Sequence, residues 1–235
     1  ICPYIKSIVE QKLSGELDSL KGVVFTNSCD GMRRLYDTWI GLDKGKNFNY
    51  ILDLPKNINE LSINYFAGLL LKFKEGLEKS FNKTFSLEDI NLSISIYNKV
   101  RDGVTMFIEK QWSGYLGQSG FEIFSVLKKG INAVPEKFSE YLTVLMNQKN
   151  NPDNLTKMPS IMLWGGVVDD EGIVKIIEDA GARVVADDLC NGSRYYDSKV
   201  DITNDTFLAL AKTYLTRIPC SRMTNVAERI SNTLN

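Results

Sequence analysis

The chain has 235 residues, 43% hydrophobic and 24% charged, a composition typical of a globular protein. Its 28 basic and 29 acidic residues leave a formal net charge of −1, so there is no basic excess to bind a nucleic-acid backbone. The apolar stretches are too short to span a bilayer and no signal-like segment is present, so we expect a cytoplasmic protein with no membrane or nucleic-acid partner.

The first third of the chain predicts alternating helices and strands. A helix begins at Pro3, because proline suits the first helical position and apolar residues then recur at helical spacing. A strand at 23–26 leads to Cys29 and a further helix, and a second strand at 48–54 is ended by Pro55. This alternation is typical of a parallel sheet.

The middle of the chain predicts long helices, and the last third returns to strands. Apolar residues form helical stripes between Phe66 and Ile108. A stretch at 147–159 is rich in Asn, Lys and Pro and indicates a linker. Beyond it, strands at 161–164 and 182–186 flank another helix. The fold class that we predict is therefore α/β.

We expect two domains, 1–150 and 151–235, with parallel sheets in tandem doubly wound (Rossmann or flavodoxin-like) folds joined by a helical segment. The second range has only two clear strands, too few for an independent sheet. We therefore expect that the natural protein continues beyond Asn235 or that a partner polypeptide completes the sheet. In both cases we expect a homo- or heterodimer, because an unfinished sheet exposes unpaired backbone groups and apolar faces.

Two of the four cysteines occur in nearly the same phrase. Cys29 and Cys190 each follow a predicted strand and begin the pattern Cys-Asp/Asn-Gly-x-Arg, which ends at Arg33 and Arg194. Such a turn places a sulfur ligand at the carboxyl edge of a sheet, where open α/β folds bind ligands. The sequence contains no histidine. Any metal or redox chemistry within it therefore has to use thiolates, carboxylates or hydroxyls.

The cysteine pattern leaves other uses open, namely two disulfides, a zinc site or inert buried thiols. A chain of this length does not need disulfides for stability, and structural zinc sites usually present cysteines in close pairs, unlike these widely separated ones. Cys2 would lie at the N-terminus of the first helix, where free N–H groups and the helix dipole favour a thiolate.

Together these segments resemble the 2-hydroxyglutaryl-CoA dehydratase D-component family, which also includes benzoyl-CoA reductase subunits and double-cubane cluster proteins. The resemblance covers most of the chain in order. It is carried by the segments 2–7, 23–37, 50–55, 96–101, 181–195 and 218–220.

The resemblance implies an iron–sulfur cluster held by cysteines in a cleft between two α/β domains. The family's first two ligand cysteines match Cys2 and Cys29, while Cys190 and Cys220 match positions that help hold the larger cluster of double-cubane proteins. The implied cofactor is a 4Fe-4S cluster, with an 8Fe-9S double-cubane cluster as the alternative. The family's third ligand usually lies in a C-terminal segment that this sequence does not contain.

The function that the resemblance implies is the iron–sulfur subunit of a 2-hydroxyacyl-CoA dehydratase. Such a lyase removes water from an acyl-CoA through a ketyl radical, after a separate ATP-dependent activator protein has supplied one electron. The alternatives are an ATP-coupled reductase of the double-cubane or benzoyl-CoA type, and a non-catalytic electron-carrying or assembly subunit. The sequence has no G-x-x-x-x-G-K-S/T motif for ATP, which fits an electron acceptor rather than the activator.

Overall fold

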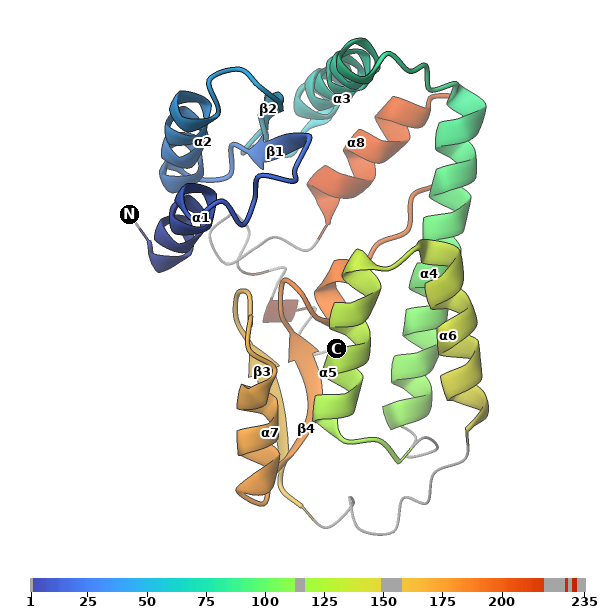
Figure 1. The fold of residues 1–235 in the computed structure, drawn as a ribbon. Helices are drawn as coiled ribbons and strands as arrows, with labels where there is room; N and C mark the ends of the chain where they lie inside the picture. Colours follow the sequence, from blue (N-terminus) through green and yellow to red (C-terminus); the bar gives the residue numbers. More distant parts are fainter. Residues whose placement is uncertain (1, 113–116, 149–157, 218–226, 228–229, 232–235) are drawn as a thin grey trace. The chain divides into compact units, whose positions relative to one another are not determined.

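The computed structural model describes residues 2–112, 117–148, 158–217, 227 and 230–231. These residues form a mixed α/β structure, which confirms the predicted class (Figure 1). The chain divides into two compact units. Unit 1 comprises Ile1–Leu87 and Asn204–Leu215, and unit 2 comprises Glu88–Thr203 and Thr216–Asn235.

Unit 1 contains one parallel pair of strands among its described residues, with helices on either side in the sequence. Its elements are α1 (Pro3–Leu13), β1 (Gly22–Thr26), α2 (Asp30–Asp43), β2 (Phe48–Leu52), α3 (Glu60–Phe81) and most of α8 (Thr206–Thr216). Strands β1 and β2 pair in register from Gly22 opposite Phe48 to Thr26 opposite Leu52. The helix predicted to begin at Pro3 and the two strands predicted for this part of the chain are therefore confirmed.

One apolar cluster in unit 1 joins α1, β1 and α2. Its buried members are Ile5, Phe25, Leu35 and Trp39. Leu35 and Trp39 are four residues apart and share one face of α2, as helical periodicity predicts. Phe25 meets the Trp39 ring edge-on, with ring centroids 5.6 Å apart, the geometry that aromatic pairs prefer. This cluster fixes α1 and α2 against the strand that precedes Cys29.

Asp43, at the end of α2, is a buried carboxylate held by polar neighbours. Its carboxylate accepts hydrogen bonds from Asn47 N (3.0 Å), Asn47 Nδ2 (2.8 Å) and Asn49 Nδ2 (2.8 Å). Lys12 Nζ lies 4.0 Å away. Burial by itself raises the pKa of Asp43, but the hydrogen bonds from Asn47 and Asn49 and the Lys12 charge outweigh it and lower that pKa.

Unit 2 contains a group of helices and a second parallel pair of strands. Its elements are α4 (Leu87–Trp112), α5 (Gly120–Asn132), α6 (Pro135–Asn147), β3 (Ser160–Trp164), α7 (Gly172–Asp179), β4 (Arg183–Asp188) and the 3-10 helix η2 (Ser193–Tyr196). Strands β3 and β4 pair in parallel, from Ser160 opposite Arg183 to Trp164 opposite Asp188. Both strands predicted for the last third are confirmed.

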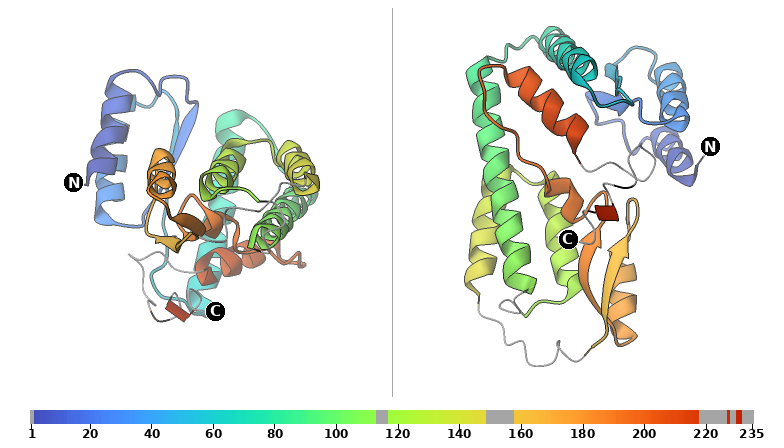
Figure 2. Two further views of the ribbon diagram at one scale, coloured as in Figure 1. Left: turned by 90° about the horizontal axis from the view of Figure 1, so that it is seen from below. Right: turned by 180° about the vertical axis from the view of Figure 1, so that it is seen from behind.

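Helix α5 connects the helices of unit 2 to its sheet. It lies between the two strands of this unit and helices α4 and α6 (Figures 1 and 2). Leu127 packs in the cluster that α4, α5 and α6 share, and Phe124 packs in a second cluster with Val174 of α7 and Val184 of β4. Glu178 accepts hydrogen bonds from the first N–H groups of α5, which belong to Gly120 (2.8 Å) and Phe121 (3.2 Å).

This packing explains why the compact units differ from the two ranges expected from the sequence, 1–150 and 151–235. Whether those ranges are domains stays a prediction. Each sheet has two strands among the described residues, so the doubly wound topology also stays a prediction. Among the helices described, none combines the length and apolar composition needed to cross a bilayer.

We expect Asp43→Asn to lower the free energy of unfolding at pH 7 by about 1–3 kcal/mol, because it removes the ionised carboxylate that accepts the hydrogen bonds from Asn47 and Asn49. The folded-state pKa of Asp43 lies below its ordinary value of 3.8. The stabilisation is therefore complete above about pH 4 and is lost as the pH falls through the lowered pKa. The difference in unfolding free energy between wild type and variant should then become smaller in acid, as measured by urea unfolding at neutral and acidic pH.

The matched control for this prediction is Asp37→Asn, which removes an exposed carboxylate of the same helix that pairs with Arg34 at 3.4 Å. Exposed pairs contribute roughly 0–1 kcal/mol, so this variant should stay close to wild type at both pH values. If Asp43→Asn differed from wild type by the same unfolding free energy at both pH values, the expectation would be contradicted.

Candidate functional site

Cys2 and Cys29 occupy the same structural position in two successive helices. Each is the N-cap residue, with extended backbone, and neither side chain makes a capping hydrogen bond. Both are free thiols and both are half-buried. Cysteine is not a usual N-cap residue, so its use at both positions leaves two sulfurs available for other partners.

The first turns of α1 and α2 pack directly on each other. A Cβ atom at Gly31 would lie 2.6 Å from Ile5 Cδ1 and 3.7 Å from Cys29 Sγ, so only glycine fits here without displacing a neighbour. Cys2 itself packs against the apolar cluster that joins α1, β1 and α2. The two cysteines predicted as ligands therefore begin two helical turns that are in contact.

The Cys29 turn lies at the carboxyl edge of the β1–β2 pair, as the sequence predicts. Asn27, the residue after β1, donates its N–H to Leu52 O at the end of β2 (2.8 Å). Helix α2 begins at Asp30 directly after the cysteine. The free N–H groups and the dipole at a helix start favour negative charge, and the starts of α1 and α2 offer two such sets of N–H groups.

Cys2 and Cys29 fit part of a ligand set for an iron–sulfur cluster. Such clusters are held by cysteine thiolates, and both of these thiols are free. Among the described residues, no group of three Cys, Asp or Glu side chains is arranged to hold a metal ion. The described part of unit 1 therefore offers two thiols of the type that such a cluster requires, and it does not complete a site.

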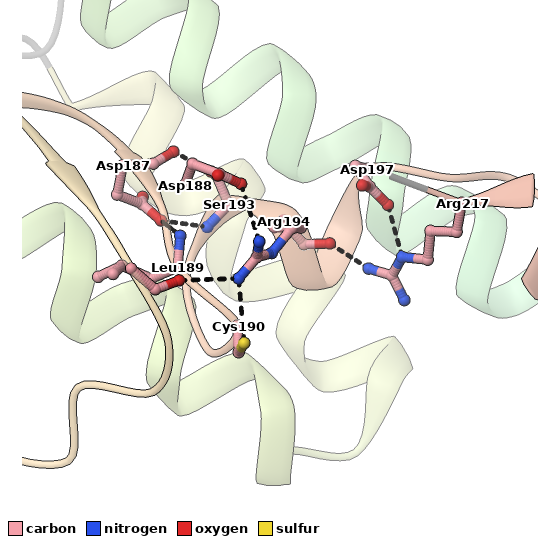
Figure 3. Close-up of polar contacts among 9 residues, drawn as sticks. Asp187, Asp188, Leu189, Cys190, Ser193, Arg194, Asp197 and Arg217 are labelled. Atoms are coloured by element: carbon pink, nitrogen blue, oxygen red, sulfur yellow. Dashed lines mark hydrogen bonds and ion pairs between the residues drawn. The ribbon is translucent and has the colours of Figure 1, made fainter. Parts of the chain in front are cut away.

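Cys190 lies in unit 2, in the loop after β4 (Figure 3). Its N–H donates to Gly166 O (3.0 Å), and its Sγ accepts a hydrogen bond from Arg194 Nη2 (3.0 Å). The same Nη2 donates to Gly165 O (3.0 Å), and Arg194 Nη1 lies 3.4 Å from Asp188 Oδ1. Arg194 is only 7% exposed. A buried guanidinium thus connects the Cys190 sulfur to the ends of both β3 and β4.

Asp187 organises the backbone of the same loop. Its Oδ1 accepts hydrogen bonds from Leu189 N (3.1 Å) and Ser193 N (2.9 Å). A Cβ atom at Gly192 would overlap this oxygen, so the loop requires glycine there. Burial raises the pKa of Asp187, with a smaller contribution in the same direction from the Asp188 charge. The hydrogen bonds from Ser193 and Leu189 offset this only in part.

Arg217 fixes the turn that carries Arg194. Its Nε donates to Asp197 Oδ1 (2.7 Å), and its Nη2 donates to Arg194 O (Figure 3). The repeated phrase Cys-Asp/Asn-Gly-x-Arg marks Arg194 in the sequence, although not its contact with sulfur. No sequence pattern marks Arg217, because its partner Asp197 lies 20 positions earlier and only folding brings the two together.

The structure describes three of the four cysteines that were predicted as ligands. Cys2 and Cys29 both lie in unit 1, Cys190 lies in unit 2, and Cys220 lies outside the described residues. Among the described residues, Cys2, Cys29 and Cys190 are all free thiols, so no disulfide joins them.

Comparison with known proteins extends this description. The family model "2-hydroxyglutaryl-CoA dehydratase, D-component" matches residues 1–235. The chain is 23% identical over 227 residues to a benzoyl-CoA reductase subunit from Thauera aromatica, and the match covers 92% of this chain and 56% of that protein. It is 23% identical over 235 residues to the (R)-phenyllactyl-CoA dehydratase beta subunit of Clostridium sporogenes (95% and 60%).

A third relative is the putative dehydratase subunit YjiM of Escherichia coli (strain K12), 23% identical over 235 residues, or 94% of this chain and 59% of that protein. The chain thus spans between 56% and 60% of the length of these three curated relatives.

We expect Arg194→Met to lower the free energy of unfolding by about 3–5 kcal/mol, because it removes one partner of a buried ion pair and two further hydrogen bonds. Arg194→Lys should lose less of the unfolding free energy, since lysine keeps the positive charge but not the forked geometry of the guanidinium. Denaturant unfolding measures both variants. Arg34→Met is the control, because Arg34 is exposed and its ion pairs with Asp30 and Asp37 are exposed too. Equal losses at positions 194 and 34 would contradict the prediction.

Proposed function

The chain belongs to the 2-hydroxyglutaryl-CoA dehydratase D-component family, and we propose that it is an iron–sulfur subunit of a 2-hydroxyacyl-CoA dehydratase. The observation that carries the proposal is the pair of free cysteines, Cys2 and Cys29, at the starts of two helices that pack on each other. A thiolate-bound cluster needs this type of ligand, and the chain has no histidine to serve instead.

In this proposal Cys2 and Cys29 hold a 4Fe-4S cluster, which when bound supplies one-electron chemistry to an acyl-CoA substrate. The residues of the chain bind and shield it. The free N–H groups and dipoles at the starts of α1 and α2 favour anionic sulfur nearby, and the apolar cluster behind them, with Phe25 and Trp39, shields that side. Cys220 and Cys190 are further candidate ligands.

The proposal includes partners. The names of the relatives describe subunits, one of a benzoyl-CoA reductase and one of a phenyllactyl-CoA dehydratase. We propose that this chain likewise works with a related subunit as a homo- or heterodimer, in the cytoplasm, and receives its electron from a separate ATP-dependent activator. Removal of water from a 2-hydroxyacyl-CoA is the proposed reaction.

A second candidate is an ATP-coupled reductase of the double-cubane or benzoyl-CoA type. The Cys190 loop favours it, because a buried arginine holds that sulfur at the end of β4 in a turn with the same sequence phrase as the Cys29 turn. A reductase with a larger cluster would use more cysteines than a single cubane. The chain is as similar to the benzoyl-CoA reductase subunit as to the phenyllactyl-CoA dehydratase subunit, at 23% identity in each case.

Iron and sulfide analysis after anaerobic purification and reconstitution tests the cofactor. We expect about four iron and four sulfide per chain for one cubane cluster, and loss of most of the iron in Cys2→Ser and in Cys29→Ser. Retained iron in Cys190→Ser supports the single cluster, whereas loss of iron there supports the larger one. A wild-type chain without iron would contradict both candidate functions.

Activity separates the two candidate functions. The reconstituted protein, together with its activator, its partner subunit and ATP, is assayed with a set of 2-hydroxyacyl-CoA esters. Release of water to form the enoyl-CoA supports the dehydratase. Failure with every ester, combined with ATP-dependent reduction of an aromatic acyl-CoA or of a small substrate such as acetylene, supports the reductase.

A further inference from the structure

The two cysteine turns share a side-chain bridge as well as a sequence phrase. In each turn, the arginine four positions after the cysteine reaches back to the residue two positions before it. Arg33 Nε and Nη2 lie 3.3 and 3.2 Å from Asn27 Oδ1, and Arg194 Nη1 lies 3.4 Å from Asp188 Oδ1. The bridge spans Cys29 in one turn and Cys190 in the other. It therefore recurs at two strand ends that have different surroundings.

In the first turn, Asn27 is also held from the opposite side. Its Nδ2 donates to Asp53 Oδ1 (2.7 Å), and its N–H donates to Leu52 O (2.8 Å). The Asn27 amide thus uses its NH₂ group toward the end of β2 and its oxygen toward the first turn of α2. The segment that carries Cys29 lies between these two attachments.

We propose that Asn27 and Arg33 are positioning residues for Cys29. Their bridge holds the turn closed and keeps the sulfur in one position at the strand end, where it would bind iron. The second turn supports this, because there the bridging arginine also contacts the sulfur, through Arg194 Nη2 and Cys190 Sγ. The inference rests on the proposed function in one respect, namely that Cys29 binds iron.

Two measurements, iron binding and the unfolding transition, distinguish a positioning role of the bridge from a general contribution to stability. The hydrogen bonds of Asn27 with Arg33 and Asp53 are exposed, and exposed polar pairs contribute little to folding. Groups that orient a metal ligand, by contrast, typically change metal affinity about 10–100-fold when they are removed. A substitution of Asn27 should therefore weaken iron binding while leaving the unfolding transition almost unchanged.

The test compares Asn27→Ala with Asn64→Ala. Asn64 is a matched control, because its amide makes one exposed hydrogen bond, to Glu60 O (2.9 Å), in α3. Each full-length protein is reconstituted anaerobically, and iron transfer to a chelator is followed over time. We expect iron release from Asn27→Ala to be about tenfold faster than from wild type, and release from Asn64→Ala to be unchanged. The urea midpoints of all three apo-proteins should agree.

A rescue variant tests the geometry of the bridge. Asn27→Asp alone sets a carboxylate against Asp53, and iron release should be fast. Adding Asp53→Asn exchanges the two groups. Position 27 then presents a carboxylate to Arg33, and position 53 presents an amide to that carboxylate. The second turn already uses a carboxylate at this place, in Asp188. The double variant should therefore regain slow iron release, which a non-specific structural effect would not produce.

Alkylation of the apo-protein separates this inference from the proposed function. Iodoacetamide labelling, quantified for each cysteine by mass spectrometry, reports Cys29 relative to Cys2 in the same chain. In Asn27→Ala this ratio should rise several-fold, because a loosened turn exposes the half-buried sulfur. An unchanged ratio, or iron release at the wild-type rate, overturns the positioning role. A wild-type chain that binds no iron overturns the proposed function, while a risen ratio still upholds the positioning of Cys29.

Discussion

The apolar cluster in which Ile5 of α1 lies against Gly31 of α2 is the constraint on which the position of the Cys2 and Cys29 turns depends. A side chain at Gly31 would displace the end of Ile5, and the surrounding cluster buries Phe25, Leu35 and Trp39. Burial of a large apolar side chain contributes roughly 1.5–3 kcal/mol, so this small cluster holds both helices firmly. This packing also determines where the two N-cap cysteines lie, since each directly precedes the first turn of one of the two helices.

The two cysteine turns apply one local design in different environments. In unit 1 the bridge from Arg33 to Asn27 is exposed, so water screens the charge and the arginine needs few partners. In unit 2 the arginine is buried, and an uncompensated guanidinium there would be costly. Arg194 accordingly contacts a sulfur, a backbone carbonyl and a carboxylate. Burial, rather than sequence, decides how many partners this arginine requires.

Asp43 and Asp187 show how the balance of burial and hydrogen bonding sets the sign of a pKa shift. Around Asp43 the donors and the Lys12 charge outweigh desolvation, so the lowered pKa makes its ionised form stabilising at neutral pH. Around Asp187 desolvation outweighs the donors and the pKa is raised. A raised carboxyl pKa favours the fold below the ordinary pKa, and this advantage is lost as the pH rises through the folded value. The ionised Asp187 therefore carries a desolvation cost that its backbone hydrogen bonds partly offset.

The sequence by itself determined the local elements and the nature of the candidate ligands. Periodicity predicted the helix that begins at Pro3, and short apolar runs predicted the strands that lead to Cys29 and Cys190. These signals lie within a few neighbouring residues, so they can be recognised without the fold. The family could also be recognised from its segments, because their order along the chain is itself sequence information.

Only the tertiary structure decided which distant groups meet. Glu178 accepts a hydrogen bond from the start of α5, 58 positions earlier, and this contact adds to the packing of Phe124 that joins α5 to β4. Arg217 reaches back to Asp197, and Arg194 turns inward to Cys190 rather than outward to solvent. A charged side chain in a sequence carries no mark of its partner. The partner depends on how apolar faces pack, and that packing is a property of the whole unit rather than of any one segment.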